Sequence, residues 1–144
     1  MDNKTNFTYG STEKLKSKKL FEQLFSEGKS VTQYPIRLVY AKTDLIKDEV
    51  SIKAGVTVSK RKFKSAVKRN RIKRVLREAY RLNKSSINNN STDKYALLFL
   101  YLGKEMPKSS EINTCMVSLL NKFNKKIAVV KQKPTAIETS TETD

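Results

Sequence analysis

The chain has 144 residues, a formal net charge of +16 and a sequence pI near 10.0. Its length suits one domain with a single core, and the excess of 30 lysines and arginines over 14 acids indicates nucleic acid or an anionic membrane surface as the partner. The composition excludes an internal disulfide, because Cys115 is the only cysteine, and it excludes catalysis by histidine, because the chain has none.

The first predicted element is a short amphipathic helix. Residues 1–11 are polar, have no hydrophobic period and contain no apolar core of a secretory signal, so we expect a disordered tail and a cytoplasmic protein. Between Ser17 as N-cap and Gly28 at the C-terminal end, the residues at helical apolar spacing are Leu20, Phe21, Leu24 and Phe25. Either both phenylalanines belong to the core, or one or both line a groove and stack on nucleobases, worth about 1–3 kcal/mol per base.

Two strands are predicted next. Within residues 29–43, a strand entered beside Pro35 is indicated by alternation of Ile36, Leu38 and Tyr40 with Arg37 and Val39. Residues 43–49 are expected to form a turn. Residues 50–58 alternate again, and their small, polar face consists of Ser51, Lys53, Gly55 and Thr57.

That polar face has two possible roles, taken together with Arg37 and Val39 from the neighbouring strand. Either this face is exposed to water, as one face of many antiparallel sheets is, or it forms the floor of a shallow groove in which an extended single strand of nucleic acid lies. Three cations leave the end of the strand and are expected at the rim of such a groove, namely Lys60, Arg61 and Lys62.

A long basic helix follows, and the segment from Lys60 to Lys84 contains one acid, Glu78. Winding residues 66–84 at about 100° per residue separates a cationic face from an apolar stripe. The stripe consists of Ile72, Val75, Leu76, Ala79 and Leu82. A charged helix face is ordinarily explained by exposure to solvent. Such a face normally carries both positive and negative side chains, which form ion pairs, whereas Glu78 is the only acid on this helix. The helix therefore predicts a polyanion site.

The rest of the chain completes the predicted core. Residues 85–93 have the composition of a loop, and the strand from Tyr95 to Leu102 is apolar on both faces, which places it inside the sheet. A third helix is predicted over Ser109 to Lys126, with a stripe formed by Ile112, Met116, Leu119, Leu120 and Phe123. Beyond about Val130, a Thr-rich acidic segment has nothing to bury and is expected to be flexible.

Catalytic side chains are scarce. The predicted folded region has no histidine, no cysteine pair and no close group of carboxylates, and a protein nuclease needs a base, a nucleophile or metal ligands. The nearest acids, Asp44, Asp48 and Glu49, are predicted to be turn residues, and Cys115 to be a small core residue. We therefore expect that the protein does not supply the reactive groups of any reaction in which it takes part.

The segment from Phe63 to Arg81, with Gly55 to Arg61 before it, closely resembles the signature of the bacterial ribonuclease P protein subunit. The match is an arginine-asparagine-arginine motif on a helix that follows a V-S-K-R strand end, and the resemblance covers roughly residues 12–126. It implies an α+β fold, a small two-layer α/β sandwich ordered helix, strands, helix, strand, helix, with about four strands and a left-handed crossover around the basic helix. The implied domain spans residues 12–128, with a disordered tail over 1–11 and a flexible tail over 129–144.

The resemblance also implies a function. The family is the RNA-binding subunit of ribonuclease P, which removes the 5′ leader from precursor tRNA; the RNA subunit does the chemistry, assisted by Mg²⁺ that the RNA mainly binds. The residues matching the helix that docks on the catalytic RNA are Arg69, Asn70, Arg71, Lys73, Arg74, Arg77 and Arg81. The residues matching the cleft for the leader are Phe21, Phe25, Lys60 and Arg61. The resemblance assigns the chain no catalytic residue and no direct metal ligand, and neither a membrane nor DNA is expected as a partner.

Two positions depart from the family pattern. Leu100-Tyr101 stands where many members end the last strand with a basic pair, so one cleft contact is lost unless Tyr101 stacks. The aromatic residue often found on the first long strand corresponds to Val39 or to Tyr40, and a shift of one residue exchanges the faces of a strand.

Two rival functions fit a basic helix on a small sheet. One is a noncatalytic ribosomal or other structural RNA-binding protein. The other is a DNA-binding helix in the major groove, which is disfavoured because lysine and arginine cover far more of the helix than a recognition strip requires.

Overall fold

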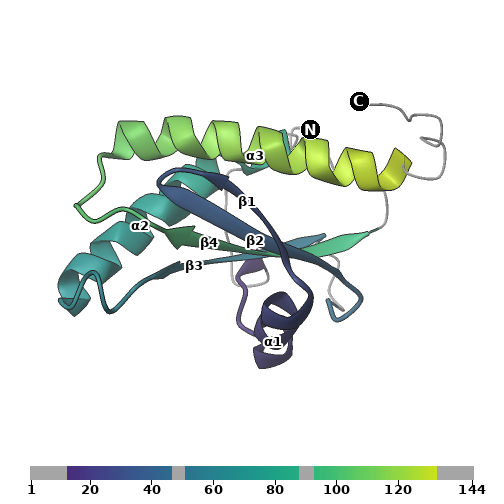
Figure 1. The fold of residues 1–144 in the computed structure, drawn as a ribbon, viewed down its shortest axis with the longest axis horizontal. Helices are drawn as coiled ribbons and strands as arrows, with labels where there is room; N and C mark the ends of the chain where they lie inside the picture. The colour runs from purple at the N-terminus through teal and green to yellow at the C-terminus, as the bar shows by residue number, and fades with distance from the viewer. Residues whose placement is uncertain (1–12, 47–50, 88–92, 133–144) are drawn as a thin grey trace.

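The computed structural model describes residues 13–46, 51–87 and 93–132. Three α-helices surround a four-stranded sheet in this part of the chain (Figure 1). In chain order the elements are α1 (Lys18–Glu27), β1 (Lys29–Gln33), β2 (Ile36–Thr43), β3 (Ile52–Val58), α2 (Ala66–Asn83), the 3₁₀ turn η2 (Lys84–Ser86), β4 (Lys94–Tyr101) and α3 (Ser109–Gln132). This order confirms the predicted α+β class.

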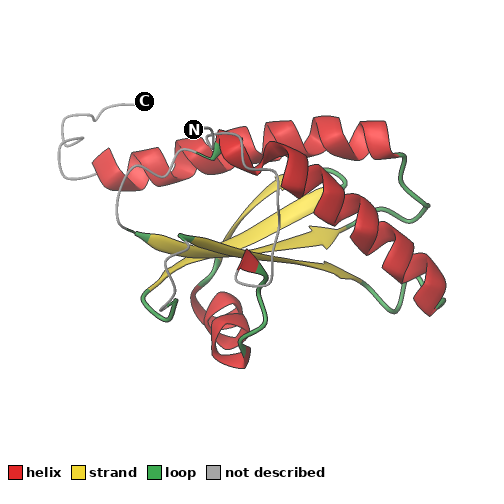
Figure 2. Cartoon of the chain, turned by 180° about the vertical axis from the view of Figure 1, so that it is seen from behind, coloured by secondary structure: helices red, strands yellow, loops and turns green. Residues whose placement is uncertain are grey.

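The sheet is mixed, with strand order β1-β2-β4-β3. β2 pairs antiparallel with β1 and with β4, whereas β3 pairs parallel with β4. The parallel pair is joined through α2, and the two views show that this crossover is left-handed, as the resemblance implied and against the usual preference (Figures 1 and 2). β4 lies inside the sheet, which confirms the prediction made from its apolar residues on both faces.

Helices cover both faces of the sheet. Figure 2 shows α2 and α3 on one side and α1 on the other. The larger core lies under α2 and α3, where the five predicted stripe residues of α3, from Ile112 to Phe123, are all fully buried. A smaller cluster lies under α1 and consists of Leu15, Leu20, Leu24, Ala41, Ile46, Ala96 and Leu98. We call the side of the sheet that carries this cluster the α1 face.

The ends of α1 were predicted correctly. The Ser17 hydroxyl accepts a hydrogen bond from the backbone N–H of Leu20 at 3.4 Å, as an N-cap does. Gly28 ends the helix with an ordinary φ of −68°, so left-handed backbone is not the reason for glycine here. A Cβ at this position would lie 2.2 Å from the Leu24 carbonyl oxygen and 2.8 Å from Val39 Cγ1. Glycine therefore lets the chain turn from α1 into β1 directly against β2.

Two elements differ most from the prediction. β1 was not predicted as a separate strand, because KSVTQ contains one apolar residue, and it forms a hairpin with β2 through Tyr34 and Pro35. α3 begins at the predicted Ser109 but continues to Gln132, six residues beyond the predicted Lys126. The predicted N-terminal tail and residues 133–144 of the predicted C-terminal tail lie outside the described residues. Within the described part of the chain, no helix is long and apolar enough to cross a membrane.

Candidate nucleic-acid interface

α2 has one buried face and one cationic face. The buried residues are Ile72, Leu76, Ala79 and Tyr80, and they pack in the larger core. The predicted stripe was wrong at one position, because Leu82 is 43% exposed whereas Tyr80 is 3% exposed. At about 100° per residue, Tyr80 lies about 60° from the middle of the arc between Ile72 and Leu76, and Leu82 lies about 100° from it. The arc of α2 that packs in the core is therefore shifted toward Tyr80 relative to the predicted apolar stripe.

The opposite face of α2 carries cationic side chains that are exposed to solvent. Its exposed polar residues include Asn70, Arg71, Arg74 and Arg77, while Lys73 and Arg81 are partly buried. The one acid on the helix, Glu78, accepts hydrogen bonds from Arg81 Nε at 3.1 Å and Arg81 Nη2 at 2.6 Å. These bonds lower the pKa of the Glu78 carboxyl, which stays ionised beside the guanidinium. Arg81 thus has an internal partner, and Arg71, Arg74 and Arg77 are left as the outward-pointing arginines.

Arg69 is engaged by the protein itself. Its Nη1 donates to the carbonyl oxygens of Phe63 at 2.8 Å and Lys64 at 3.0 Å. Both acceptors belong to the loop that enters α2, so Arg69 fixes this loop against the first turn of the helix. A guanidinium has five donor hydrogens, and the remaining ones are available to an external anion.

The loop after β3 forms a fixed turn that presents two cations. The Ser59 hydroxyl accepts hydrogen bonds from the N–H groups of Arg61 at 3.1 Å and Lys62 at 3.3 Å. Lys62 Nζ donates to the Leu102 carbonyl oxygen at 3.0 Å and ties the turn to the end of β4. Lys60 and Arg61 are exposed on this turn, next to the end of the strand where they were predicted to stand.

The α1 face is less polar than predicted. The prediction placed Arg37 and Val39 directly beside β3, but β4 lies between β2 and β3. The registers pair Val39 and Gly55 with Leu98, and Arg37 and Thr57 with Leu100. Directly paired residues share a face of the sheet. Leu98 and Leu100 therefore lie in the middle of the α1 face, between the residues of β2 and those of β3.

The N-terminal segment covers part of the α1 face. Lys14 forms a parallel bridge with Ala54, and the N–H of Leu15 donates to the Ala54 carbonyl oxygen at 2.9 Å. A Cβ on Gly55 would lie 3.2 Å from Leu15 Cβ, so Leu15 packs directly over Gly55. The accessible part of the α1 face is therefore the end that carries Arg37, Thr57 and Leu100.

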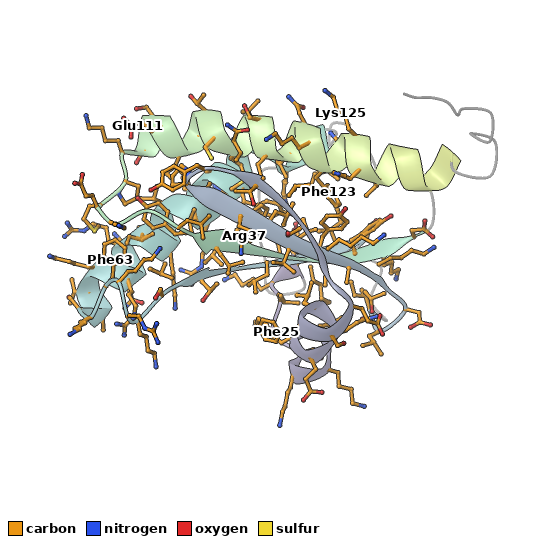
Figure 3. All side chains as sticks on the ribbon, viewed as in Figure 1. Phe25, Arg37, Phe63, Glu111, Phe123 and Lys125 are labelled. Atoms are coloured by element: carbon orange, nitrogen blue, oxygen red, sulfur yellow. The ribbon has the colours of Figure 1, made fainter. Side chains whose placement is uncertain are left out.

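The two phenylalanines of α1 have different environments. Phe21 is half-buried and packs against the smaller cluster together with Val39 and Leu100. Phe25 is 74% exposed, and Figure 3 shows it on the side of α1 that is turned toward the start of α2. The prediction that both rings belong to the core is therefore wrong for Phe25, and stacking of a ring on a nucleobase stays a prediction.

The structure resolves both departures from the family pattern. Tyr40 is buried and meets Phe123 edge to face at a ring distance of 5.1 Å, so Val39 is the residue on the α1 face. Tyr101 is also buried, and its hydroxyl donates to the Glu105 carbonyl oxygen at 2.7 Å. The idea that Tyr101 stacks on a base was wrong, because the strand pleat turns Leu100 to the α1 face and Tyr101 into the core.

The described residues form no group of three or more histidine, cysteine or acidic side chains that could hold a metal ion. Cys115 is buried, its Sγ–H donates to the Gln33 carbonyl oxygen at 2.8 Å, and burial raises the pKa of its thiol. A neutral thiol is a poor nucleophile. Of the three acids predicted to be turn residues, Asp44 is exposed, and Asp48 and Glu49 lie outside the described residues.

The assembled site combines two surfaces on adjacent elements. One is the cationic face of α2. The other is the accessible end of the α1 face, which has an exposed aromatic ring and the cations of the turn after β3. The sequence missed the contribution of β1, which places the exposed Thr32 beside Arg37 on the same face.

Three comparisons bear on this arrangement. The family model for Ribonuclease P matches residues 10–124. The ribonuclease P protein component of Porphyromonas gingivalis is 34% identical over 119 residues, covering 81% of this chain and 86% of the relative. Among solved structures, the RNase P protein from Thermotoga maritima superposes with a TM-score of 0.62 at 23% identity, covering 76% of this chain and 96% of that one. The Staphylococcus aureus RNase P protein gives a TM-score of 0.61 at 21% identity, covering 77% and 94%.

Proposed function

The chain belongs to the ribonuclease P protein family, and from this membership we propose that it is the RNA-binding subunit of the ribonucleoprotein that cuts the 5′ leader from precursor tRNA. In this proposal α2 docks on the catalytic RNA subunit and the α1 face holds the single-stranded leader. The RNA carries out the cleavage. The observation that carries the proposal is the pairing of an almost uniformly cationic helix face with a sheet face that is covered in part by α1, which presents an open aromatic ring.

The cationic face of α2 suits a folded RNA. Planar guanidinium groups contact phosphate oxygens in pairs, and Arg71, Arg74 and Arg77 are exposed along one side of the helix. Asn70 is also exposed and can both donate and accept hydrogen bonds. Such contacts neutralise phosphates without selecting a base sequence, so they fit recognition of a partner by its shape.

The α1 face suits a single strand of varied sequence. Base stacking on Phe25 requires only a π-face, which every base has, while Arg37, Lys60 and Arg61 can neutralise the backbone. Leu98 and Leu100 make the floor more apolar than a purely electrostatic site requires. A surface of this kind binds leaders of many sequences, as an enzyme that processes many precursor tRNAs requires.

Magnesium belongs to the RNA in this proposal. The carboxylates of the described residues do not gather into a metal-binding group, so no step is assigned to an ion held by the protein. The protein acts by holding the catalytic RNA and the leader, and it lowers the Mg²⁺ concentration needed because bound cations reduce repulsion between RNA phosphates.

The direct test is cleavage of precursor tRNA by the reconstituted particle. We expect the protein, added to a ribonuclease P RNA, to increase the cleavage rate most at low Mg²⁺, measured by appearance of the free leader in single-turnover assays. The RNA alone and the protein alone are the controls. Absence of any gain at low Mg²⁺ would favour a structural RNA-binding protein, and cleavage by the protein alone would contradict the assignment of chemistry to the RNA.

The leader contact is tested by replacing Phe25 with alanine. We expect affinity for leader-bearing precursor to fall about 5- to 150-fold, because stacking contributes about 1–3 kcal/mol per base. Affinity for mature tRNA should stay within twofold of the unaltered protein. The measurement is fluorescence anisotropy of both RNAs with the reconstituted particle, and an equal loss for both would remove Phe25 from the leader site.

A further inference from the structure

A second basic surface lies at the opposite edge of the sheet from β3. β1 is this edge, and a hollow of about 320 Å³ beside it is lined by Ser30, Val31, Thr32, Lys122, Lys125 and Lys126. We call these six residues the β1-edge hollow. The proposed function assigns no role to the β1-edge hollow.

The lining of the hollow contains three lysines and no acidic residue. All three of its lysines are exposed and come from two adjacent turns of α3, where like charges three and four residues apart repel each other. No ion pair is recorded for them among the described residues. The lining also includes Ser30 and Thr32 of β1, and it contains no acid. Such a lining suits phosphate oxygens.

The hollow is held in shape by a contact between α3 and the edge strand. Lys122 Nζ donates to the Thr32 carbonyl oxygen at 2.9 Å. This bond fixes the helix against β1 and leaves Lys125 and Lys126 without a recorded bond among the described residues. Figure 3 shows Lys125 on the outer side of α3, away from the sheet.

The hollow is continuous with the α1 face. Thr32 is paired with Arg37, and Ser30 with Val39, so the hydroxyl side chains of β1 lie on the same face as the proposed leader site. β1 is only five residues long, and in the described part of the chain no strand pairs with its outer side. A single strand that crosses Arg37 thus meets Thr32 next and then the three lysines around the edge.

We infer that the leader track does not end at β2 but turns around the β1 edge, so that Lys122, Lys125 and Lys126 contact phosphates of leader nucleotides farther from the cleavage site. This inference rests on the proposed function, because it assigns more of the same leader to the protein. It predicts that affinity rises with leader length beyond what the α1 face alone can contact.

The test uses the double variant Lys125→Gln and Lys126→Gln, which spares the Lys122 contact. Precursor tRNAs with leaders of about 4 and about 12 nucleotides cover the usual range of single-strand sites. With the reconstituted particle, we expect affinity for the long leader to fall about 2- to 25-fold, the range of two exposed ion pairs, and affinity for the short leader to stay unchanged. The slope of log K against log salt for the long leader should fall by up to about 1.4.

The matched control is Lys19→Gln with Lys108→Gln, which removes the same charge at two exposed positions away from the hollow. It should affect both leaders equally. Equal losses for short and long leaders in the Lys125/Lys126 variant, or no loss with either, would overturn the inference while leaving the proposed function intact. If the unaltered protein does not distinguish leader-bearing precursor from mature tRNA, the leader site itself fails, and the inference fails with it.

Discussion

Replacing Arg71, Arg74 and Arg77 together with alanine is expected to weaken binding to the ribonuclease P RNA by up to roughly 500-fold at about 0.1 M salt. Each lost phosphate contact removes about 0.9 from the slope of log K against log salt, so three contacts should flatten the slope by about 2.7. All three arginines are exposed and have no recorded bond among the described residues, so the fold should not change. The measurement is a binding titration repeated over a series of KCl concentrations.

A control with the same loss of charge separates docking from general attraction. The triple variant Lys16→Ala, Lys19→Ala and Lys108→Ala removes three exposed cations outside α2, and its slope should change by less than half as much. Arg69 is unsuitable for this comparison, because its guanidinium also holds the loop carbonyls of Phe63 and Lys64. Equal slopes for the two triple variants would show that α2 makes no specific contact with the RNA.

Replacing Phe123 with alanine should lower the free energy of unfolding by about 3–5 kcal/mol, which is the usual cost of removing a buried aromatic ring. Phe123 is fully buried and packs edge to face against Tyr40 and Tyr95, with ring distances of 5.1 and 5.6 Å. The ring thus joins α3 to the two central strands. For a chain of this length, the melting temperature should fall by roughly 10–20 °C.

Phe25→Ala is the matched control for stability. The same substitution at a ring that is 74% exposed should change the free energy of unfolding by less than about 0.5 kcal/mol. Urea titration followed by circular dichroism measures both variants under one set of conditions. A large loss with Phe25→Ala would mean that this ring supports the fold and would weaken its assignment to the leader.

The sequence was most informative where a hydrophobic period is long. α3 and most of α2 were predicted with their buried residues because a stripe over several turns allows one orientation only. β1 was missed because a five-residue edge strand needs little apolar surface, and Val31 is its one buried residue. The order of strands was also out of reach, since alternation defines the two faces of a strand but not its neighbour. This is why β4 was not expected between Arg37 and Thr57.

The roles of individual aromatic residues also depended on the tertiary structure. Phe21 and Phe25 lie only about 40° apart on the helix, and the sequence cannot show which ring the sheet covers. Phe21 packs against the smaller cluster, as Val39 and Leu100 do, whereas Phe25 is exposed. Arg69, by contrast, was predicted from its motif as an RNA contact, and its bonds to the loop carbonyls had no signal in the sequence. One arginine can bind the protein backbone and an external anion at the same time, so the sequence pattern alone does not show which of the two it binds.

Both outer strands of the sheet have backbone groups that are bonded by other parts of the chain, and this bears on the pairing of one copy with another. On β3 the bridge from Lys14 and the Leu15 N–H occupy backbone groups at Ala54, and on β1 the Lys122 ammonium occupies the Thr32 carbonyl. Unpaired edges invite another chain to add a strand, and lysine on an edge is a common defence against such aggregation. These contacts therefore reduce the number of unpaired backbone groups with which the edge of a second copy could form a sheet.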